Sequence, residues 1–444
     1  MRKKILLTVV VALLAAVSLR SCSRGPEIVF SIDSETTVGT QPFTVRFSSA
    51  GEGLKNITVS YVGEYSTILL ETKQYPEGVK DDTVDISLNP FAGIEDGPAE
   101  IRATAEVYGG GLGSGGETTK TRKIVADLSP PKITVISATE NRILHAGSGV
   151  IIYKVSPDAV ESGVRIGDRF FKGHKAAPGA GFSDKDVRIS FFSYPHEVDE
   201  GETVLVTAVD PIGNHRKLPV SYSLERNPIE DTRIEITDKF IKMKMLPLIS
   251  ASEGMSLKEI FLVVNNRIRL VNGKKVERVL SRTAEKIMWE GAFLRPVGEL
   301  QAGFQKRDYV FNGESLDTQF HLGYDLASQR RNPVRASNNG VVVFADDLGI
   351  YGNTIIVDHG MGVATLYAHL SSMSAHRGDT VAKNDIIGTT GATGLAFGDH
   401  LHFGMYIGGV PVSPKQWWDP FWVKTRITEN IDDARRATGA GREN

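Results

Sequence analysis

The feature that most constrains the fold is an alternation of apolar and polar residues over short runs bounded by turn residues. Residues 43–47 (FTVRF) and 57–61 (ITVSY) place an apolar side chain at every second position. Side chains two residues apart lie on the same face of a β-strand, so such runs predict half-buried strands. Glycine is abundant, with 45 residues, and this suits a chain with many turns. We therefore expect a mainly β protein.

The length and charge of the chain limit its organisation and its partners. A chain of 444 residues is too long for one ordinary domain, so we expect two to four. Its 41% hydrophobic and 23% charged residues are typical of a folded globular protein. The formal net charge of -2 offers no electrostatic reason to expect a nucleic acid partner.

The N-terminus has the layout of an export signal. Three basic residues at positions 2–4 precede an apolar run over residues 5–19, which is shorter than the ~20 residues that span a bilayer. Cys22 is the only cysteine, and the segment 19–22 (LRSC) resembles the cleavage box of bacterial lipoproteins, except at Arg20. Two alternatives stay open for residues 1–25, a lipoprotein or membrane anchor at Cys22 and a signal peptide cleaved elsewhere or retained. Either one predicts an exported protein of the cell envelope or periplasm, without disulfides.

Two β modules are expected after the export signal, at residues 26–128 and 132–226. The stretch 127–131 (DLSPP) separates them as a linker, because two prolines cannot extend a ladder. The strand-then-turn ending over residues 204–214 resembles bacterial immunoglobulin-like repeats, and each module has the size of a small sandwich. We predict two immunoglobulin-like β-sandwich modules.

Two local patterns in these modules have no predicted chemical role. The glycine-rich stretch 109–116 lies between two strand-like runs, 99–108 and 118–126, so it predicts a hairpin loop and not a phosphate-binding loop. The four histidines of this region have no partners at ligand spacing, and we expect surface or turn positions for them: His145, His174, His196 and His215.

Residues 228–294 are predicted to form a helical connector. The sequence 256–259 (SLKE) has the form of a capping box, and residues 275–289 place apolar side chains at helical spacing before Pro296 breaks the pattern. The connector is either a spacer or a segment that lies against a catalytic groove. At the other end of the chain, residues 425–444 are expected to form a tail, as a loose helix or a disordered segment.

The residues that carry chemistry are clustered near the C-terminus, where six of the ten histidines lie between positions 321 and 402. His321 and Asp325 are four residues apart, a spacing that puts both side chains on one face of a strand or a helix. The β-rich context and Gly323 favour the strand. In a strand, His400 and His402 face one side while Leu401 faces the other.

Two histidines and one carboxylate are a common ligand set for catalytic zinc, with water as the fourth ligand. The chain has no His-Glu-x-x-His helix and no cysteine pair, so the common alternative zinc sites are absent from the sequence. Spacing alone leaves two interpretations, a metal site and an accidental cluster of histidines in a β-sheet.

Ordered sequence blocks between about residues 294 and 423 resemble the lysostaphin/LytM-type zinc endopeptidases. That family shares a His-x-x-x-Asp element and a terminal His-x-His, which are HLGYD at 321–325 and HLH at 400–402 here. Residues 395–399 (LAFGD) depart from the small residues usual before the last element. Further matching blocks occur in order at 333–336, 340–342, 351–353, 358–360, 367–371, 378–379 and 388–394.

The resemblance implies a role for each of five polar residues. It implies that His321, Asp325 and His402 bind one zinc ion per chain. It also implies that His369 and His400 orient or deprotonate the water and stabilise the oxyanion, a task that suits the histidine pKa of ~6.5. It implies a zinc metallopeptidase domain over residues 295–424, built on an antiparallel sheet, and no further cofactor.

Neighbouring residues are expected to have structural roles. We interpret His359 as a structural residue in a turn between strands, His376 as a surface residue and Tyr367 as a wall residue more than a catalyst. Gly388, Gly391 and Gly394 are expected either to admit an extended peptide or to serve hairpins alone.

The function implied by the resemblance is that of an exported zinc metalloendopeptidase that hydrolyses peptide cross-links of bacterial peptidoglycan through a metal-activated water. Its expected partners are peptidoglycan stem peptides, with membrane attachment through the N-terminus left open. The alternative is a non-catalytic envelope protein whose peptidase-like domain binds and activates another wall hydrolase, but such members typically lack a ligand and this chain has all five polar residues. An adhesin built on the β modules would leave the histidines unexplained.

Overall fold

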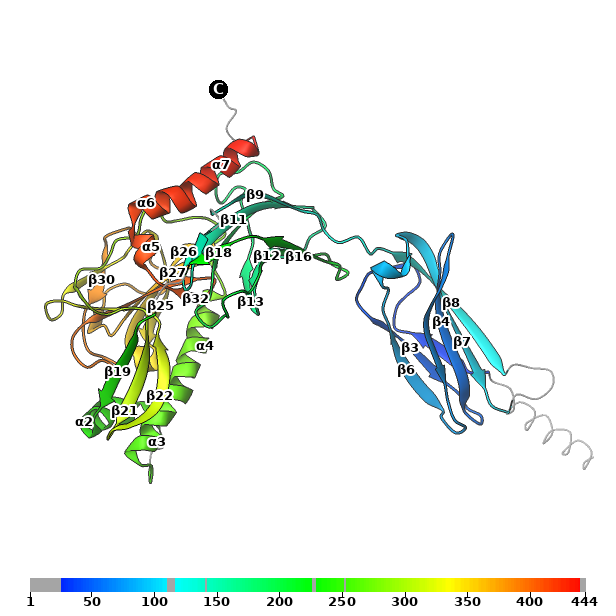
Figure 1. The fold of residues 1–444 in the computed structure, drawn as a ribbon, viewed down its shortest axis with the longest axis horizontal. Coiled ribbons are helices and arrows are strands. Elements are labelled where there is room, and N and C mark those ends of the chain that lie inside the picture. Colours follow the sequence, from blue (N-terminus) through cyan, green and yellow to red (C-terminus); the bar gives the residue numbers. More distant parts are fainter. Residues whose placement is uncertain (1–24, 110–115, 140–141, 226–228, 251–252, 440–444) are drawn as a thin grey trace, which may run out of the picture. The chain divides into compact units, whose positions relative to one another are not determined.

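A computed structural model describes residues 25–109, 116–139, 142–225, 229–250 and 253–439 (Figure 1). The chain divides into two compact units, one up to Pro131 that also holds Val209–His215, and one with Lys132–Ala208 and the rest of the chain from Arg216. The predicted export signal, apart from residue 25, lies outside the described residues. Within the described part of the chain, no helix is both long enough and apolar enough to cross a membrane.

The first unit consists of two β-sheets around one core. Phe47 from one sheet and Ile57 and Tyr61 from the other are buried together, which confirms the alternation expected for their strands. The last two strands form the predicted hairpin, although residues 110–115 of its loop lie outside the described residues. An immunoglobulin-like relationship stays a prediction. The sheets are β1(Glu27–Phe30)-β3(Phe43–Ser48)-β6(Asp81–Ile86) and β2(Thr36–Val38)-β8(Glu117–Ala126)-β7(Gly97–Val107)-β4(Leu54–Val62)-β5(Thr67–Gln74), with the short helix η1(Pro90–Ala92) after β6.

The second β module has three sheets and shares its core with the C-terminal domain. Ile152 and Phe191 of this module belong to the same buried cluster as Trp289, Met405 and Ile431 from later in the chain. The module is therefore packed against the C-terminal domain. Its sheets are β14(His174–Lys175)-β15(Val187–Ser193)-β11(Ser148–Val155)-β9(Ile133–Ala138), β13(Arg169–Lys172)-β12(Glu161–Ile166)-β16(Val204–Val209)-β17(His215–Val220) and β10(Arg142–Leu144)-β18(Ser223–Glu225).

The prediction of surface or turn positions for the histidines of this module is wrong for His174. That residue lies in β14 with 3% of its surface exposed, and its Nδ1 is 3.0 Å from a carboxylate oxygen of Glu285. His196 is half-buried, with its ring centroid 4.6 Å from that of Phe320. Both partners lie more than a hundred residues further along the chain, so no local pattern indicates these contacts.

The connector begins with a strand and becomes helical only afterwards. β19 (Asp231–Ile236) pairs in parallel with β21 (Gln305–Phe311), which is antiparallel to β22 (Glu314–His321). The predicted capping box is confirmed, because Ser256 and Glu259 bond each other's backbone N–H groups at the start of α3 (Leu257–Leu262). The remaining helices of the connector are α2(Asp238–Phe240), η2(Ile241–Met245), η3(Leu246–Leu248), η4(Val263–Ile268) and α4(Arg269–Leu280).

The helix predicted over residues 275–289 ends at Leu280, earlier than expected. Thr283 donates a hydrogen bond of 2.7 Å from its hydroxyl to Asp358, and the backbone N–H of Ala284 donates one of 2.8 Å to the same carboxylate. These bonds hold the segment against the neighbouring strand in a non-helical conformation. The chain therefore leaves the helix to make a polar contact with the sheet.

The C-terminal domain is built on an eight-stranded antiparallel sheet that positions the site. Asp325 and His402 are direct cross-strand partners, and Ala368, just before His369, pairs with His402 from the other side. A smaller sheet, β24(Pro333–Arg335)-β30(Ile386–Thr389)-β28(Ser372–Met373), accompanies it. The main sheet runs β20(Glu299–Ala302)-β23(Tyr324–Ala327)-β31(Leu401–Ile407)-β27(Val363–Ala368)-β26(Asn353–Gly360)-β25(Gly340–Asp347)-β29(Thr380–Val381), with β32(Val410–Val412) paired to β31 and η5(Gly349–Tyr351) before β26.

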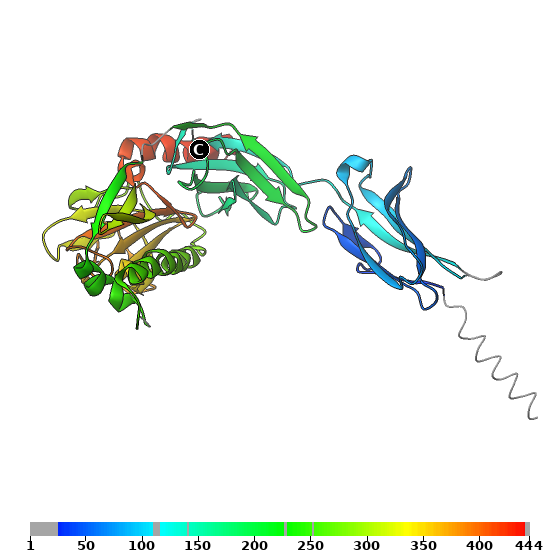
Figure 2. The same ribbon diagram turned by 60° about the horizontal axis from the view of Figure 1, so that its bottom comes forward.

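Each face of the main sheet has its own core. Leu401 and Phe403 point into one cluster, whereas Leu366 and Tyr406 pack with Phe261 and other connector residues on the opposite face. Figure 2 shows the connector helices, in green, beside the yellow and orange strands of this domain. Of the two arrangements considered for the connector, the structure favours the one in which it is not a separate spacer, because it packs against the C-terminal domain.

The described part of the predicted tail 425–444 is a packed helix. The chain continues through α5 (Lys415–Trp418), α6 (Pro420–Trp422) and η6 (Val423–Thr428) into α7 (Glu429–Ala437). Ile427 and Ile431 are buried in the core shared with the second β module, and Ser137 of β9 donates a 2.8 Å hydrogen bond to Asn430. In Figures 1 and 2 the red helix lies along β9. Residues 440–444 lie outside the described residues.

Candidate metal centre

Three potential metal ligands meet where two sheets adjoin. His321 is the last residue of β22, Asp325 lies in β23 and His402 lies in β31. Between His321 and Asp325 the chain passes from the three-stranded sheet to the eight-stranded one through a bend at residues 322–323. The extended backbone expected around this pair is therefore present, but interrupted between the two residues.

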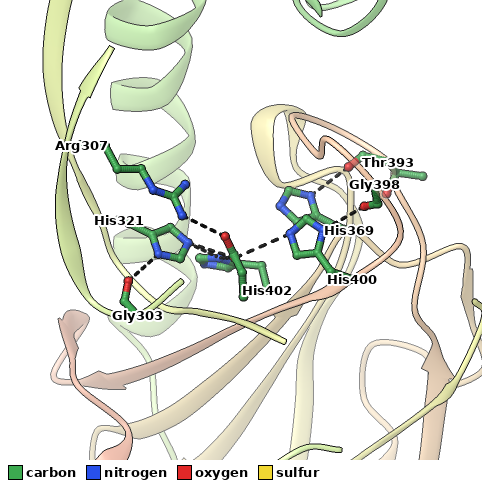
Figure 3. Close-up of polar contacts among 9 residues, drawn as sticks. Gly303, Arg307, His321, His369, Thr393, Gly398, His400 and His402 are labelled. Carbon is green, nitrogen blue, oxygen red and sulfur yellow. Dashed lines mark hydrogen bonds and ion pairs between the residues drawn. The ribbon is translucent and has the colours of Figure 1, made fainter. Parts of the chain in front are cut away.

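The three side chains converge on one point. His321 Nε2 lies 2.9 Å from Asp325 Oδ1 and 3.0 Å from His402 Nδ1, and the last two atoms are 2.9 Å apart (Figure 3). This set is the group of His, Cys, Asp and Glu residues with metal-binding geometry among the described residues. The three sequence-predicted zinc ligands are thus brought together.

The surrounding backbone fixes the orientation of the ligands. His321 Nδ1–H donates to the carbonyl oxygen of Gly303 at 2.7 Å, which leaves the lone pair of Nε2 directed at the site. Gly323 packs against the His402 ring so closely that a Cβ there would lie 2.7 Å from its Nε2. A glycine is therefore needed at position 323 for the two ligand-bearing strands to approach each other.

The protonation states of the protein itself suit metal binding. Burial lowers the pKa of His321 to about 4, so its imidazole is neutral at pH 7, as a ligand must be. Burial would raise the pKa of Asp325, but the adjacent imidazoles of His321, His400 and His402 outweigh it and hold that pKa well below its usual value. Asp325 is therefore an anion next to two inward-facing nitrogen atoms.

This donor set fits a zinc ion. Two imidazole nitrogens and one carboxylate oxygen, with a fourth position facing a pocket, are the ligands of many catalytic zinc sites. The three converging atoms lie so close together that at most one hydrogen can lie between any two of them. A cation between them satisfies their lone pairs better than hydrogen bonds do.

His369 and His400 stand beside these ligands, as the sequence predicts. Their ring centroids are 4.9 Å apart, and the His369 ring lies 5.8 Å from that of His402. His369 Nδ1–H donates to Thr393 O and His400 Nδ1–H donates to Gly398 O, both at 2.8 Å. Each histidine therefore keeps Nε2 for the reacting groups, and His400 Nε2 is 3.6 Å from Asp325.

The backbone at His369 is strained. Its φ of 61° lies in the left-handed region, which residues with a Cβ seldom adopt. The backbone N–H donates to Tyr351 O at 2.8 Å, and together with the Thr393 bond this holds the imidazole beyond the end of β27. Strain of this kind is concentrated at functional sites.

Comparison with known proteins decides the identity of this domain. The model of the family described as Peptidase family M23 matches residues 319–414, which include all five of these polar residues.

The C-terminal domain is a peptidase family M23 domain.

The relatives that it resembles include cell-wall enzymes. The DD-carboxypeptidase/endopeptidase Mpg of Neisseria meningitidis is 45% identical over 96 residues, which are 22% of this chain and 22% of the relative. The peptidoglycan DD-endopeptidase ShyA of Vibrio cholerae is 37% identical over 93 residues, 21% of this chain and 22% of the relative. The chain thus matches about a fifth of the length of these proteins. The solved catalytic domain of lysostaphin from Staphylococcus simulans is 27% identical, with a TM-score of 0.23, over 28% of this chain and 92% of that domain.

Arg307 is a residue of the M23 domain's site that sequence reasoning missed. Its Nη2 donates a 2.9 Å hydrogen bond to Oδ2 of Asp325, the oxygen that does not face the histidine ligands. It lies on β21, before the matched family segment, and only the pairing of β21 with β22 brings it to the site. A lone arginine in an alternating strand carries no signal that distinguishes it from a surface residue.

A pocket of about 150 Å³ opens beside the candidate metal ligands of the M23 domain. One wall belongs to the connector, where the Phe240 ring stacks on that of Phe397 with 4.1 Å between centroids, and Lys244 donates a 2.5 Å hydrogen bond to Ala392 O. This volume is below the ~300 Å³ at which small-molecule pockets usually begin. The connector therefore forms part of the pocket wall and narrows the space beside the candidate metal ligands. The pocket is lined by Ile234, Ile236, Phe240, Met245, Asn265, Arg269, Arg307, Tyr309, His321, Asp325, Ile350, Tyr351, His369, Leu395, Phe397, His400 and His402.

The remaining histidines of the M23 domain are outside the site. His359 is structural, as predicted, but it lies within β26 and not in a turn, and both its ring nitrogens are bonded, to Asn339 O at 2.7 Å and to Thr365 Oγ1 at 2.8 Å. The prediction for His376 is confirmed, with 82% of its side chain exposed.

Tyr367 and the glycine segment also have structural roles. The prediction of Tyr367 as a wall residue is wrong, because this side chain is fully buried and its hydroxyl accepts the backbone N–H of Ser337 at 2.7 Å. A Cβ on Gly388, Gly391 or Gly394 would lie 2.5 Å from backbone atoms of neighbouring segments. The structure therefore gives these glycines a role in close packing within the fold, which is neither of the two roles considered.

Proposed function

We propose that this protein is an exported zinc metalloendopeptidase that hydrolyses peptide cross-links in bacterial peptidoglycan. The observation that carries the proposal is the convergence of His321, Asp325 and His402 within 3.0 Å, with His369 and His400 beside them. Similarity to DD-endopeptidases that act on peptidoglycan supports the substrate, and the sequence of residues 1–25 supports export to the cell envelope.

The chain's own residues supply what peptide hydrolysis needs around the metal. A zinc ion held by the three ligands would polarise the scissile carbonyl and lower the pKa of a bound water to near ~7. His369 and His400 each present Nε2 to the same space, so they can take up the proton of the attacking water and stabilise the oxyanion.

The environments of these two histidines differ in a way that suits separate tasks. Burial, with His400 and His402 nearby, lowers the pKa of His369 well below its usual value. Burial would lower the pKa of His400 as well, but the Asp325 carboxylate, 3.6 Å from its Nε2, outweighs this and raises the pKa. We therefore assign proton acceptance to His369 and hydrogen-bond donation to His400.

Digestion of purified cell-wall sacculi tests the proposal. Zinc-loaded protein covering residues 23–444 is incubated with sacculi, and the released muropeptides are identified by mass spectrometry. We expect cross-linked dimers to become monomers, and the His402→Ala variant to leave them intact. His376→Ala is the matched control, because it removes an exposed histidine of the same domain.

The same experiment separates the alternative function. If the zinc-loaded protein leaves sacculi unchanged, the endopeptidase proposal is wrong. Stimulation of a second wall hydrolase by both the unmutated protein and His402→Ala would then support a non-catalytic activator.

A further inference from the structure

The charged groups lining the pocket do not balance one another. Arg269 and Arg307 both line it, whereas Asp325 is the one carboxylate among its described lining residues. Asp325 already faces the histidine ligands through Oδ1 and Arg307 through Oδ2. A divalent cation bound by Asp325 would add further positive charge, so the pocket is suited to an anion.

Arg307 has hydrogen-bond donors that the protein does not use. Its side chain is 17% exposed, and Nη2 is bonded to Asp325. Its Nε–H is buried and has no hydrogen-bond partner in the described structure. An unmet buried donor on a charged group is costly, and a guanidinium that spends only part of its donor capacity on Asp325 can donate to a further carboxylate.

Arg269 adds a second positive charge that no carboxylate neutralises. Its Nε donates to Asn265 O at 3.1 Å and its Nη2 to Asn265 Oδ1 at 2.7 Å, so its contacts are with neutral oxygens. Asn265 is itself held by Asp317 at 2.6 Å. Among the described residues Arg269 has no ion pair, and its guanidinium is fixed at the wall of the pocket by these bonds.

Cross-link chemistry provides a suitable anion. When a cross-link joins an alanine carbonyl to an amine on a diaminopimelate stereocentre, the carbon bearing that amine also carries a free carboxylate. A C-terminal residue removed by a carboxypeptidase has the same arrangement. An internal bond of a glycine bridge has no carboxylate next to its leaving nitrogen.

We propose that Arg307 and Arg269 form an anion subsite that binds a free carboxylate on the residue whose amine is released. This inference rests on the proposed function and narrows its substrate class to peptide bonds with a carboxylate on the leaving side. Arg307 also contacts Asp325, and a purely positioning role for it would give no preference for a charged leaving residue.

Two matched probes test the subsite. One is a synthetic dimer in which D-alanine is linked to diaminopimelate with its leaving-side carboxylate free, and the other carries a carboxamide there. With zinc-loaded protein we expect kcat/KM for the acid to exceed that for the amide by about 10- to 100-fold, the range of a charge-assisted hydrogen bond. A ratio near one in the unmutated protein overturns the inference.

Variants then assign the preference to the arginines. We expect Arg307→Gln and Arg269→Gln each to lower the acid-to-amide ratio towards one while bound zinc per chain is retained. A uniform fall of both rates in Arg307→Gln, with the ratio unchanged, would show that Arg307 acts only through Asp325. Lys306→Gln and Arg267→Gln are matched controls, because these exposed neighbours do not line the pocket.

Failure of the inference differs from failure of the proposed function. Equal cleavage of both probes, together with digestion of sacculi, contradicts the subsite and leaves the endopeptidase standing. No cleavage of either probe or of sacculi contradicts the endopeptidase, and the subsite with it.

Discussion

Two buried histidines in the same sheet show how a structural imidazole differs from one in the candidate metal centre. His359 in β26 is 0% exposed. One of its ring nitrogens is hydrogen-bonded to a backbone carbonyl and the other to a hydroxyl. His402 in β31 is 4% exposed, but its Nδ1 faces another histidine nitrogen and a carboxylate oxygen. Burial is nearly equal in the two cases. The two residues differ in their neighbours. The neighbours of His359 satisfy both ring nitrogens through hydrogen bonds, whereas the neighbours of His402 direct their own lone pairs at the same point, where a cation can bind.

Replacing each histidine by alanine gives the largest contrast. We expect His402→Ala to lose zinc and to reduce peptidase activity by more than the ~10⁴-fold upper limit for a lost proton-transfer group. His359→Ala should keep stoichiometric zinc while losing about 2–4 kcal/mol of unfolding free energy, because it removes two buried hydrogen bonds and leaves a cavity. Metal analysis and denaturant unfolding of both variants check this. If the His359→Ala variant folds but binds no zinc, the predicted difference between His359 and His402 is wrong.

The outer histidines should behave as a third class. His369→Ala and His400→Ala are expected to retain zinc and to reduce kcat by about 10²- to 10⁴-fold, since the three ligands remain while proton handling is lost. Zinc content and steady-state kinetics of the purified variants measure this. Loss of zinc on either substitution would instead make that residue a ligand.

The pH dependence of stability sharpens the comparison further. Burial lowers the pKa of His359 to about 4, whereas an unfolded chain takes up the same proton near ~6.5. The stabilising effect of the neutral ring is complete above pH ~6.5 and is lost as pH falls towards 4, by about 3 kcal/mol. The difference in unfolding free energy between the unmutated protein and His359→Gln should shrink over this range. Because His321 is present in both proteins, its contribution cancels, and a pH-independent difference would contradict the assignment.

The smallest effect is expected at a buried carboxylate that has only a structural role. Asp358 accepts hydrogen bonds from Thr283 and from the backbone of Ala284, in contrast to Asp325, which faces imidazole nitrogens. Thr283→Val should therefore cost about 1–2 kcal/mol of stability and leave zinc affinity unchanged. Thermal unfolding and zinc titration test this, and a weakened zinc site would link the connector to the metal ligands.

The proximity of the candidate metal ligands within each pair could be predicted from sequence because their spacing reports local geometry. The pairs His321 with Asp325 and His400 with His402 each place two side chains on one face without knowledge of the fold. The register that makes Asp325 the cross-strand partner of His402 is set by contacts across 77 residues, and no local pattern contains it.

The parts that could not be predicted depend on pairing between distant segments. Arg307 reaches the site because β21 pairs with β22, and His174 is buried because Glu285 meets it from the connector. The strand β19 was missed for a different reason. Its alternating sequence, residues 231–236, stands before a long helical pattern, and the connector was interpreted as one helical unit.

The parallel pairing of β19 with β21 has a consequence for attempts to isolate the M23 domain in a minimal form. The recognisable family segment starts at residue 319, yet the neighbouring strand that carries Arg307 is itself flanked by a strand from residues 231–236. A fragment cut at the edge of the recognisable segment would expose an unpaired sheet margin prone to aggregation. Transplanting this domain into another protein would therefore require about ninety residues upstream of the matched family segment.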